Sequence, residues 1–363
     1  MGQPLQTRLR LLFTASKKDV TESILPDLLS FTFDDKETAE ADEISITLKD
    51  IDGKWACNWK PNGGEVVRAY ISTGTVAKKK REIFCGSFYV DSIRTSGSPR
   101  TFEMKAVSIP LNKPIRRKFK SRSWESQFLT EIAQTIANEA ELKLVFDSNE
   151  NPKYDRQDQY EESDLKFLSR LCEDAGLSIK VTNEKIVIFD QFRYESKTPV
   201  KTLTLGSSDI LSWDFDIVQS ETYKSCTINY RDPKKKKEGS AAGYNTNTEN
   251  TTEKSSANAA VCSWTEYDPL YEENGQEYEM KKRAKSLDEA KRLAKAKLRK
   301  LNSRSVTGSI TVIGDVMLRA GLVITCKGFG KVDGNFIIET SSHSVSTSGY
   351  TTALSLRRVN SSY

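Results

Sequence analysis

Alternating apolar and polar residues dominate both ends of the chain and predict β-strands there. Near the start, residues 7–13, 29–34 and 43–50 alternate with a period of two. Near the end, residues 309–315 and 328–338 do the same, and Gly or Asp-Gly punctuates them. A period of two places every second side chain on one face, which is typical of antiparallel strands joined by tight turns. Both ends therefore predict all-β regions of the barrel or sandwich type.

Between these ends, apolar residues recur with the spacing of an α-helix. An amphipathic helix is predicted over about 123–136, because apolar residues recur there every four positions. They are Trp124, Phe128, Ile132 and Ile136. A short apolar run at 142–146 predicts a strand, and the polar stretch 147–162 predicts a loop.

A second helix is predicted from Ser163 to Gly176. Ser163 is placed to cap its first turn, and Asp164 suits the positive end of the helix dipole. Gly176 suits the left-handed position at a helix C-terminus. Apolar runs at 177–181 and 185–189 then predict a hairpin.

A chain of 363 residues favours two or three domains. We expect a mainly β fold with an α+β insert: a first β-barrel at 1–120, an α/β module at 121–200 and a second β-barrel at 201–363. Low hydrophobicity predicts a polar loop at about 233–280. A Ser-Leu-Asp-Glu capping box predicts a helix at about 286–301.

Several motifs together resemble a known family. Residues 159–171 carry the order Glu-Ser-Asp-x-x-Phe-Leu-x-Arg-Leu, and a Gly-Leu pair follows at 176–177. Residues 309–356 carry Gly-Asp, Gly-Phe-Gly-x-x-Asp-Gly and Gly-Tyr-Thr-Thr, while 42–50 and 85–91 supply matching strands. These motifs resemble the phage late control D family, the baseplate hub of contractile tails, and the hub part of type VI secretion spike proteins. The resemblance spans nearly the whole chain apart from about 233–280.

The resemblance implies a structural assembly role for the chain. Members of the family form a trimeric ring with two tube-like barrels per chain, which matches the hexameric tail tube on one side and the trimeric spike on the other. The implied partners are two further copies, the tube protein, the spike protein and other baseplate components. The resemblance implies no catalytic, cofactor or metal-binding residue.

The resemblance leaves the parent particle open between an infectious phage, a bacteriocin and a secretion device. The implied location is the bacterial cytoplasm during assembly, followed by the baseplate of the particle. The chain stops at Tyr363, soon after the second barrel, so we expect the spike and any lysozyme to be separate chains.

Composition adds limits to this interpretation. Hydrophobic residues make up 37% of the chain and charged residues 29%, and no apolar run is long enough for a membrane span. The first ten residues contain no apolar signal core, so we expect no Sec-type export and no membrane anchor. With 55 basic and 50 acidic residues, the net charge of +5 is too balanced to imply nucleic-acid binding.

The six cysteines are scattered and form no CxxC pair. Four of them lie in apolar runs, where a free thiol behaves as a small hydrophobe. We therefore expect buried thiols and no metal or redox site. The six are Cys57, Cys85, Cys172, Cys226, Cys262 and Cys326.

Catalytic candidates are few. His343 is the only histidine, and we expect it to serve packing or hydrogen bonding. The acidic pairs Asp34-Asp35 and Glu161-Glu162 leave a cell-wall hydrolase as the alternative function, although a glycosidase needs two carboxylates set apart across a substrate. The glycines at 328–330 do not match a nucleotide-binding loop, because a strand follows them.

Two basic segments leave DNA binding as a further alternative. Lys234–Lys237 form a run, and residues 281–300 give a helix a basic face. We expect a solvated loop and a solvated helix face, since no aromatic residues interleave with the basic ones for base stacking.

Overall fold

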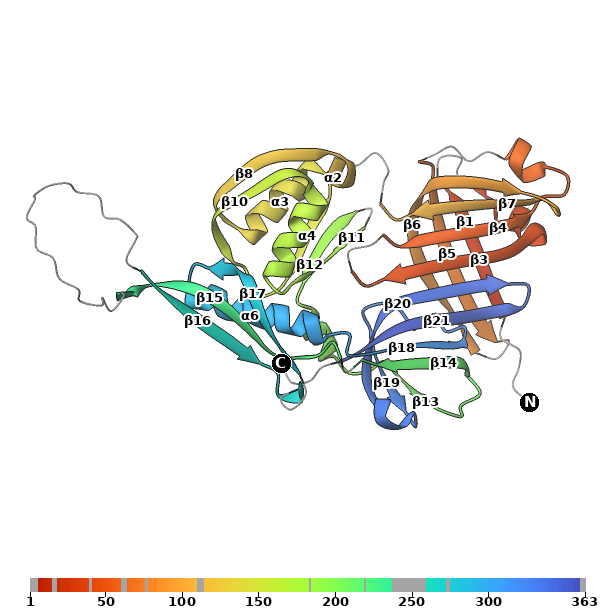
Figure 1. The fold of residues 1–363 in the computed structure, drawn as a ribbon. Coiled ribbons are helices and arrows are strands. Elements are labelled where there is room, and N and C mark those ends of the chain that lie inside the picture. Colours follow the sequence, from red (N-terminus) through yellow and green to blue (C-terminus); the bar gives the residue numbers. More distant parts are fainter. Residues whose placement is uncertain are drawn as a thin grey trace, which may run out of the picture. The chain divides into compact units, whose positions relative to one another are not determined.

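The computed structural model describes residues 6–14, 18–38, 41–59, 64–75, 78–109, 114–182, 184–218, 220–236, 259–271 and 275–359. The chain divides into two compact units (Figure 1). The first comprises residues 1–173, 177–217 and 306–361. The second comprises 174–176, 218–305 and 362–363.

Six strands of the first unit surround one hydrophobic core, and we call this part the first lobe. They are β1 (Gln6–Phe13), β3 (Leu28–Lys36), β4 (Glu43–Lys49), β5 (Val66–Thr75), β6 (Lys78–Ser96) and β7 (Thr101–Val107). Every one of them turns alternate apolar side chains into that core, such as Leu11, Phe33 and Ile46. The sheet must therefore curl around the core to bring six strands to it.

Short elements complete the first lobe. They are β2 (Lys18–Asp19), α1 (Thr21–Ile24), η1 (Leu25–Asp27) and the single turn η2 (Lys54–Asn58). Trp55 of η2 is buried in the core of the lobe, and its indole N–H donates to Asp27 at 2.9 Å. The expected strands at 7–13, 29–34 and 43–50 are confirmed as β1, β3 and β4.

The C-terminal strands of the same unit enclose a second core and form the second lobe. They are β13 (Lys201–Thr204), β14 (Ile210–Ile217), β18 (Val306–Ile313), β19 (Val323–Lys327), β20 (Gly334–Ser346) and β21 (Gly349–Arg358), with the short helix η5 (Gly330–Val332). Ile310, Phe336 and Leu354 are among the residues of that core. The tight turn expected at 328–334 is confirmed, since the Asp333 carboxylate accepts from the N–H groups of Gly328 and Phe329.

The two lobes share one continuous sheet. Strands β3 and β20 pair antiparallel from Thr340 opposite Lys36 to Ser346 opposite Ser30, and we call this pairing the seam. The sheet then runs in the order β14-β18-β21-β20-β3-β4-β7-β6-β5-β1-β2. Because the first and last segments of the chain meet in one sheet, the division at residues 120 and 200 stays a prediction.

The α/β module lies between the lobes in sequence. A two-stranded antiparallel sheet of β8 (Phe119–Phe128) and β10 (Lys153–Ser163) accompanies a three-stranded sheet of β11 (Ser178–Val181), β12 (Lys185–Phe189) and β9 (Lys143–Asp147). Its helices are α2 (Pro114–Arg117), α3 (Leu129–Glu139), α4 (Asp164–Asp174) and α5 (Gln191–Glu195). The mainly β fold with a helix-containing insert is thus confirmed, as are the strand at 142–146 and the hairpin at 177–189.

Two expectations for this module are wrong, namely where its first helix starts and the loop at 147–162. The helix expected at about 123–136 is confirmed from Leu129 onward as α3, with Ile132 and Ile136 buried, but the preceding residues back to Phe119 form strand β8. Trp124 is buried from that strand and stacks on Phe167 of α4, so its apolar character did not mark a helix face. The loop expected at 147–162 contains β10, whose buried residues include the polar Gln159 and Glu162 and therefore give no apolar alternation.

The second unit is a separate three-stranded sheet with one helix. The strands lie in the order β16 (Ala259–Tyr267), β15 (Tyr223–Lys236) and β17 (Gln276–Ala284), and η4 (Pro269–Tyr271) connects two of them. Helix α6 (Leu287–Asn302) packs Leu293 and Leu298 into a core with Ile228. The capping box is confirmed, since Ser286 Oγ accepts from the N–H of Glu289 at 3.2 Å.

The polar loop expected at 233–280 is wrong for the part that the structure describes. Strand β15 continues to Lys236, and β16 and β17 fall within the same range. These strands show only weak apolar alternation, since most of β17 is exposed. Residues 237–258, with most of the Asn/Thr/Ser-rich stretch, lie outside the described residues. No helix in the described ranges is long and apolar enough to cross a membrane.

Candidate functional site

The Glu-Ser-Asp motif at 162–164 lies where strand β10 passes into helix α4. Ser163 Oγ accepts from the N–H of Lys166 at 3.3 Å, so the predicted cap is confirmed. Asp164 follows as the first residue of the helix, and only 2% of its side chain is exposed. A carboxylate buried to this degree requires hydrogen-bonding or charged partners.

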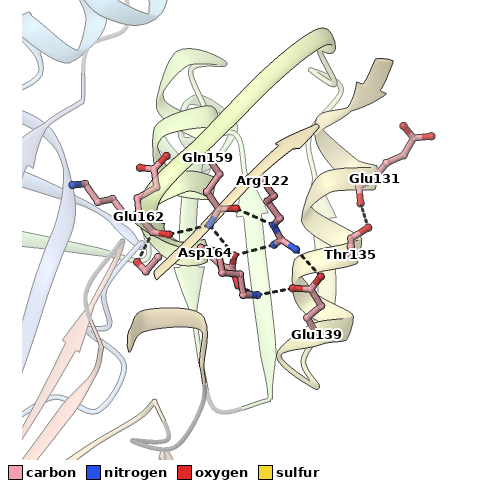
Figure 2. Close-up of polar contacts among 10 residues, drawn as sticks. Arg122, Glu131, Thr135, Glu139, Gln159, Glu162 and Asp164 are labelled. Carbon is pink, nitrogen blue, oxygen red and sulfur yellow. Dashed lines mark hydrogen bonds and ion pairs between the residues drawn. The ribbon is translucent and has the colours of Figure 1, made fainter. Parts of the chain in front are cut away.

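Three side chains supply those partners from the two-stranded sheet of β8 and β10 (Figure 2). Lys120 Nζ lies 2.6 Å from one carboxylate oxygen of Asp164, and Arg122 donates to the other at 2.9 Å. Gln159 Nε2 donates to the same oxygen at 2.9 Å and to the carbonyl of Glu162 at 3.0 Å. Both oxygens of Asp164 are therefore satisfied by donors held on one two-stranded sheet.

A second carboxylate balances the charge of this network. Glu139, at the C-terminal end of α3, accepts from Lys120 and Arg122 at 2.7 Å each. The hydrogen bond from Arg122 is the largest effect that lowers the pKa of Glu139. Burial disfavours the charge of Lys120, but its bonds to Asp164 and Glu139 outweigh this and raise its pKa. Two cations of β8 and two anions thus link this strand to helices α3 and α4.

The acidic pair at 161–162 does not form a carboxylate dyad. Glu161 is exposed and has a φ of 44° where the β8–β10 register shifts. Glu162 is mostly buried and pairs with Arg170 of α4 at 2.8 Å. The two carboxyl groups therefore have different environments, and Glu162 serves the packing of α4 against β10.

Of the acidic pair at 34–35, Asp35 belongs to a second buried cluster, which joins the module to both lobes. Lys180 Nζ of β11 lies 3.0 Å from Asp35 and 3.2 Å from Asp42. Arg319, which precedes β19, lies 3.3 Å from the other oxygen of Asp35. Burial disfavours the charge on Lys180, but the nearby Asp35 and Asp42 carboxylates outweigh it and raise its pKa.

Arg357 of β21 centres a third buried group. Its guanidinium lies 2.9 Å from Glu195 of α5 and 3.2 Å from Glu339 of β20. Nearby, Gln191 Nε2 donates to Glu37 at 2.9 Å. Burial raises the pKa of Glu37 to about 7, which Arg357 only partly offsets. Charged side chains of the first lobe, the module and the second lobe therefore meet at these two clusters.

His343 lies on β20 at the seam and is fully buried. Ser341 Oγ donates to the carbonyl of Leu318 at 2.6 Å, so the hydrogen bond of 3.1 Å between Ser341 and His343 Nε2 takes its proton from the imidazole. Nδ1 is then the acceptor for the Tyr350 hydroxyl at 2.8 Å. Burial lowers the pKa of His343 to about 4. The ring also stacks on Phe33 across the seam, which places His343 in packing and hydrogen bonding.

Two lysines of the basic helix face contact aromatic rings and are therefore not simply solvated. Lys291 of α6 lies over the ring of Trp264 at 4.7 Å, and Lys297 lies over Tyr278 at 5.3 Å. The fold brings these aromatic residues beside the lysines from β16 and β17, a proximity that no spacing in the sequence reveals. The backbone of 234–236 belongs to β15, while Lys237 lies outside the described residues.

The thiols are mostly buried, as expected. Cys85, Cys172, Cys226 and Cys326 are buried, Cys262 is half-buried and Cys57 is exposed. Burial raises the pKa of Cys172 to about 12, which keeps the thiol protonated. Within the described ranges, no group of three His, Cys, Asp or Glu residues could hold a metal ion.

The sequence motif marked this region, but the residues that pair with it were missed. Lys120 and Arg122 alternate along β8, just before the predicted start of the first helix at about 123. Gln159 lies in the stretch for which the sequence predicts a loop. The sequence does carry one signal for this cluster: two basic residues, Lys120 and Arg122, stand two positions apart, and Asp164 later begins a helix.

Comparisons with known proteins match this architecture. The family model described as phage tail baseplate hub (GPD) matches residues 64–349. The probable baseplate hub protein of Escherichia phage 186 is 28% identical over 234 residues, which cover 62% of this chain and 58% of that protein. The chain thus spans little more than half the length of that relative.

Solved structures share the fold. A 43 kDa tail protein of prophage MuSo2 from Shewanella oneidensis has a TM-score of 0.69 at 14% identity and covers 97% of this chain and 98% of its own. The c3393 protein of E. coli, a component of the type VI secretion system, has a TM-score of 0.55 at 13% identity, with coverage of 93% and 75%. The resemblance found in the sequence is confirmed, and the chain belongs to the phage tail baseplate hub family.

Proposed function

We propose that this chain is a structural subunit of a tail baseplate hub, in which three copies form a ring between the hexameric tail tube and the trimeric spike. The observation that carries this proposal is the pair of β-lobes, each with its own core, on one continuous sheet. Three copies then present six lobes to a sixfold tube. Closed cyclic symmetry is the common arrangement of protein assemblies with identical subunits.

The partners in this proposal are two further copies of the chain, the tube protein, the spike protein and other baseplate components. Assembly takes place in the bacterial cytoplasm before the hub becomes part of the particle. The buried charge clusters around Asp35 and Arg357 serve this role by fixing the module to both lobes, and the cluster around Asp164 holds the elements of the module together. Removing one partner of a buried ion pair is strongly destabilising, so such clusters hold one geometry.

The native mass of the purified chain, alone and mixed with the spike protein of the same particle, tests the proposal. We expect a trimer, or a complex of three chains with three spike subunits. A chain that stays monomeric in both samples and ignores the spike would overturn the ring.

We also propose that the chain has no hydrolase activity. Asp35 faces Lys180 and Arg319, and Glu162 faces Arg170, so one carboxylate of each candidate pair is held by a cationic partner. Peptidoglycan clearing by the pure protein is the direct assay, and we expect none. Clearing that disappears in Glu162→Gln would establish the hydrolase instead.

A further inference from the structure

The outer face of the first lobe carries a group of arginine and aromatic side chains on β1, β5 and β6, three strands that pair side by side (Figure 1). Core residues such as Leu9, Leu11 and Ala69 point inward from these strands. Because side chains alternate between the two faces of a strand, the residues between them point outward. We call this outward set the arginine face: Arg8, Arg10, Arg68, Tyr70, Glu82 and Phe84.

One row of the arginine face runs across all three strands. Arg10 of β1 lies opposite Tyr70 of β5, and Tyr70 lies opposite Phe84 of β6. The guanidinium carbon of Arg10 is 4.2 Å from the centroid of the Tyr70 ring, and the centroids of the Tyr70 and Phe84 rings are 4.9 Å apart. Phe84 is nevertheless 47% exposed. A large apolar side chain is thus held in place at the surface, next to a cation.

Positive charge outweighs negative charge on the arginine face, which has three guanidinium groups and the single carboxylate of Glu82. Arg10 lies 3.5 Å from Glu82, yet 45% of the Arg10 side chain remains exposed. Arg8 and Arg68 are exposed, and neither has an ion pair with another residue that the structure describes. Their charges are therefore available to an anionic group from outside the chain.

The spacing of these arginines matches the repeat of an extended protein segment. Arg8 and Arg10 stand two residues apart on β1, which separates them by about 7 Å, and Arg68 belongs to the neighbouring strand β5. Carboxylates at alternate positions of an extended segment repeat at the same distance. A guanidinium group binds a carboxylate through two parallel hydrogen bonds, and Arg, Tyr and Phe are enriched where proteins meet. The arginine face therefore has the composition and spacing of a surface for an acidic protein.

The same rings are poorly placed for stacking on nucleic-acid bases. Proteins that bind single strands present aromatic ring faces on which successive bases stack. One face of Tyr70 is already occupied by the guanidinium group of Arg10, and the Tyr70 ring packs against Phe84 at a tilt of 36°. The aromatic residues thus supply an apolar anchor beside the charges. This arrangement favours a protein partner over a nucleic acid.

We propose that the arginine face binds an acidic surface of another baseplate protein, with carboxylates of that protein on Arg8 and Arg68 and an apolar side chain over Phe84. The contact uses side chains on the broad face of the sheet and joins this chain to a different protein, not to a second copy. This inference rests on the hub function proposed above, and it assigns a surface and a chemistry to one of the partners. Charged residues with a desolvated aromatic anchor are typical of the few residues that dominate binding energy.

Charge reversal tests the chemistry of the arginine face. The variant Arg8→Glu/Arg68→Glu reverses two exposed charges and leaves the contact of Arg10 with Tyr70 intact. Fluorescence anisotropy with labelled poly-L-glutamate and with a labelled oligo-dT strand, at several salt concentrations, gives the readout. We expect the wild type to bind poly-L-glutamate more tightly than oligo-dT, with an affinity that falls as salt screens the charges. In the variant the affinity for poly-L-glutamate should fall about tenfold or more, because like charges then face each other.

Binding of the purified baseplate proteins of the same particle tests the whole contact. At least one of them should bind the wild type and lose about tenfold or more in affinity with Arg8→Glu/Arg68→Glu and also with Phe84→Ser, which removes the apolar anchor. The matched controls are Arg94→Glu/Arg116→Glu, at exposed residues outside the arginine face, and Phe119→Ser, at a phenylalanine that is 68% exposed. Both controls should keep the wild-type affinity, and thermal unfolding shows that all variants are folded.

The outcomes separate this contact from the ring. The contact is overturned if every baseplate protein and poly-L-glutamate bind the variants as they bind the wild type. Tighter binding of oligo-dT that disappears with Arg8→Glu/Arg68→Glu would overturn it in favour of a nucleic acid. A trimer that this variant converts to monomers would also overturn it, since the face then lies between copies. A wild-type chain that stays monomeric, but binds a baseplate protein with the expected loss in both variants, supports the contact and overturns the ring.

Discussion

The hydroxyl group of Tyr350 donates to Nδ1 of His343 at 2.8 Å, inside the hydrophobic core at the seam between the lobes. The Nε2 proton of the same imidazole is held by Ser341, whose own proton goes to the carbonyl of Leu318. A neutral imidazole can donate from Nε2 to Ser341 and accept at Nδ1 from Tyr350. A second proton, on Nδ1, would instead point at the hydroxyl proton of Tyr350. The only histidine of the chain is therefore held neutral by its surroundings.

We expect this histidine to make the protein less stable in mild acid. The folded pKa is about 4 against an ordinary value of 6.5, so the unfolded chain binds the proton first as pH falls. Between pH 6.5 and pH 4 the wild type should lose up to about 3 kcal/mol relative to His343→Gln. Urea unfolding of both proteins across this range gives the difference. A difference that stays constant with pH would contradict the buried neutral ring.

Glu37 should make the protein less stable as pH rises, which is opposite to the effect of His343. Its pKa is raised from 4.5 to about 7 by burial, so the folded protein holds a proton that the unfolded chain releases. The wild type should therefore lose up to about 3 kcal/mol relative to Glu37→Gln as pH rises from 4.5 to 7. The same urea series measures this change. A difference in the free energy of unfolding that stays constant, or that shifts in favour of the wild type as pH rises, would show that Glu37 is ionised in the fold.

The network around Asp164 should be costly to break. Asp164→Ala leaves Lys120 and Arg122 without their buried carboxylate, and we expect a loss of about 3–5 kcal/mol. Asp158→Ala removes an exposed carboxylate from β10 of the same two-stranded sheet and should cost much less, because exposed ion pairs contribute little to stability. Thermal unfolding of the two variants compares them. Equal losses would mean that the network contributes no more than a surface contact.

Gly314 should not tolerate a side chain. A Cβ at this position would overlap the ring of Tyr350, so Gly314→Ala forces that ring from its place beside His343. We expect overpacking to cost about 1–3 kcal/mol. In a Tyr350→Ala background the same change should cost much less, and a double-mutant cycle measures this coupling. Additive losses would place the strain elsewhere.

Local signals in the sequence predicted the elements whose ends and faces are marked by single residues. Ser163 caps α4, Gly176 has a φ of 73° beyond its end, and Ser286 opens α6. Apolar alternation likewise predicted β1, β3 and β4, whose inner residues all enter one core. These features depend on neighbours within a few residues, which is the range that pattern analysis covers.

Elements stabilised by polar burial could not be predicted in this way. Strand β10 buries Gln159 and Glu162, whose partners Arg122 and Arg170 lie on other elements. Trp124 belongs to a strand although its spacing to Phe128 suggested a helix. The charge clusters also join residues as distant as Asp35 and Arg319, a proximity that only the completed fold provides.

The seam has a consequence for the order in which the chain can fold during synthesis. Strand β3 ends at Lys36, but its partner β20 begins at Gly334, so nearly the whole chain must leave the ribosome before they meet. Until then β3 lacks one neighbour, and contacts this distant in sequence are slow to form. The first lobe thus waits for the last strands, and truncated or stalled chains expose an edge that the finished protein hides.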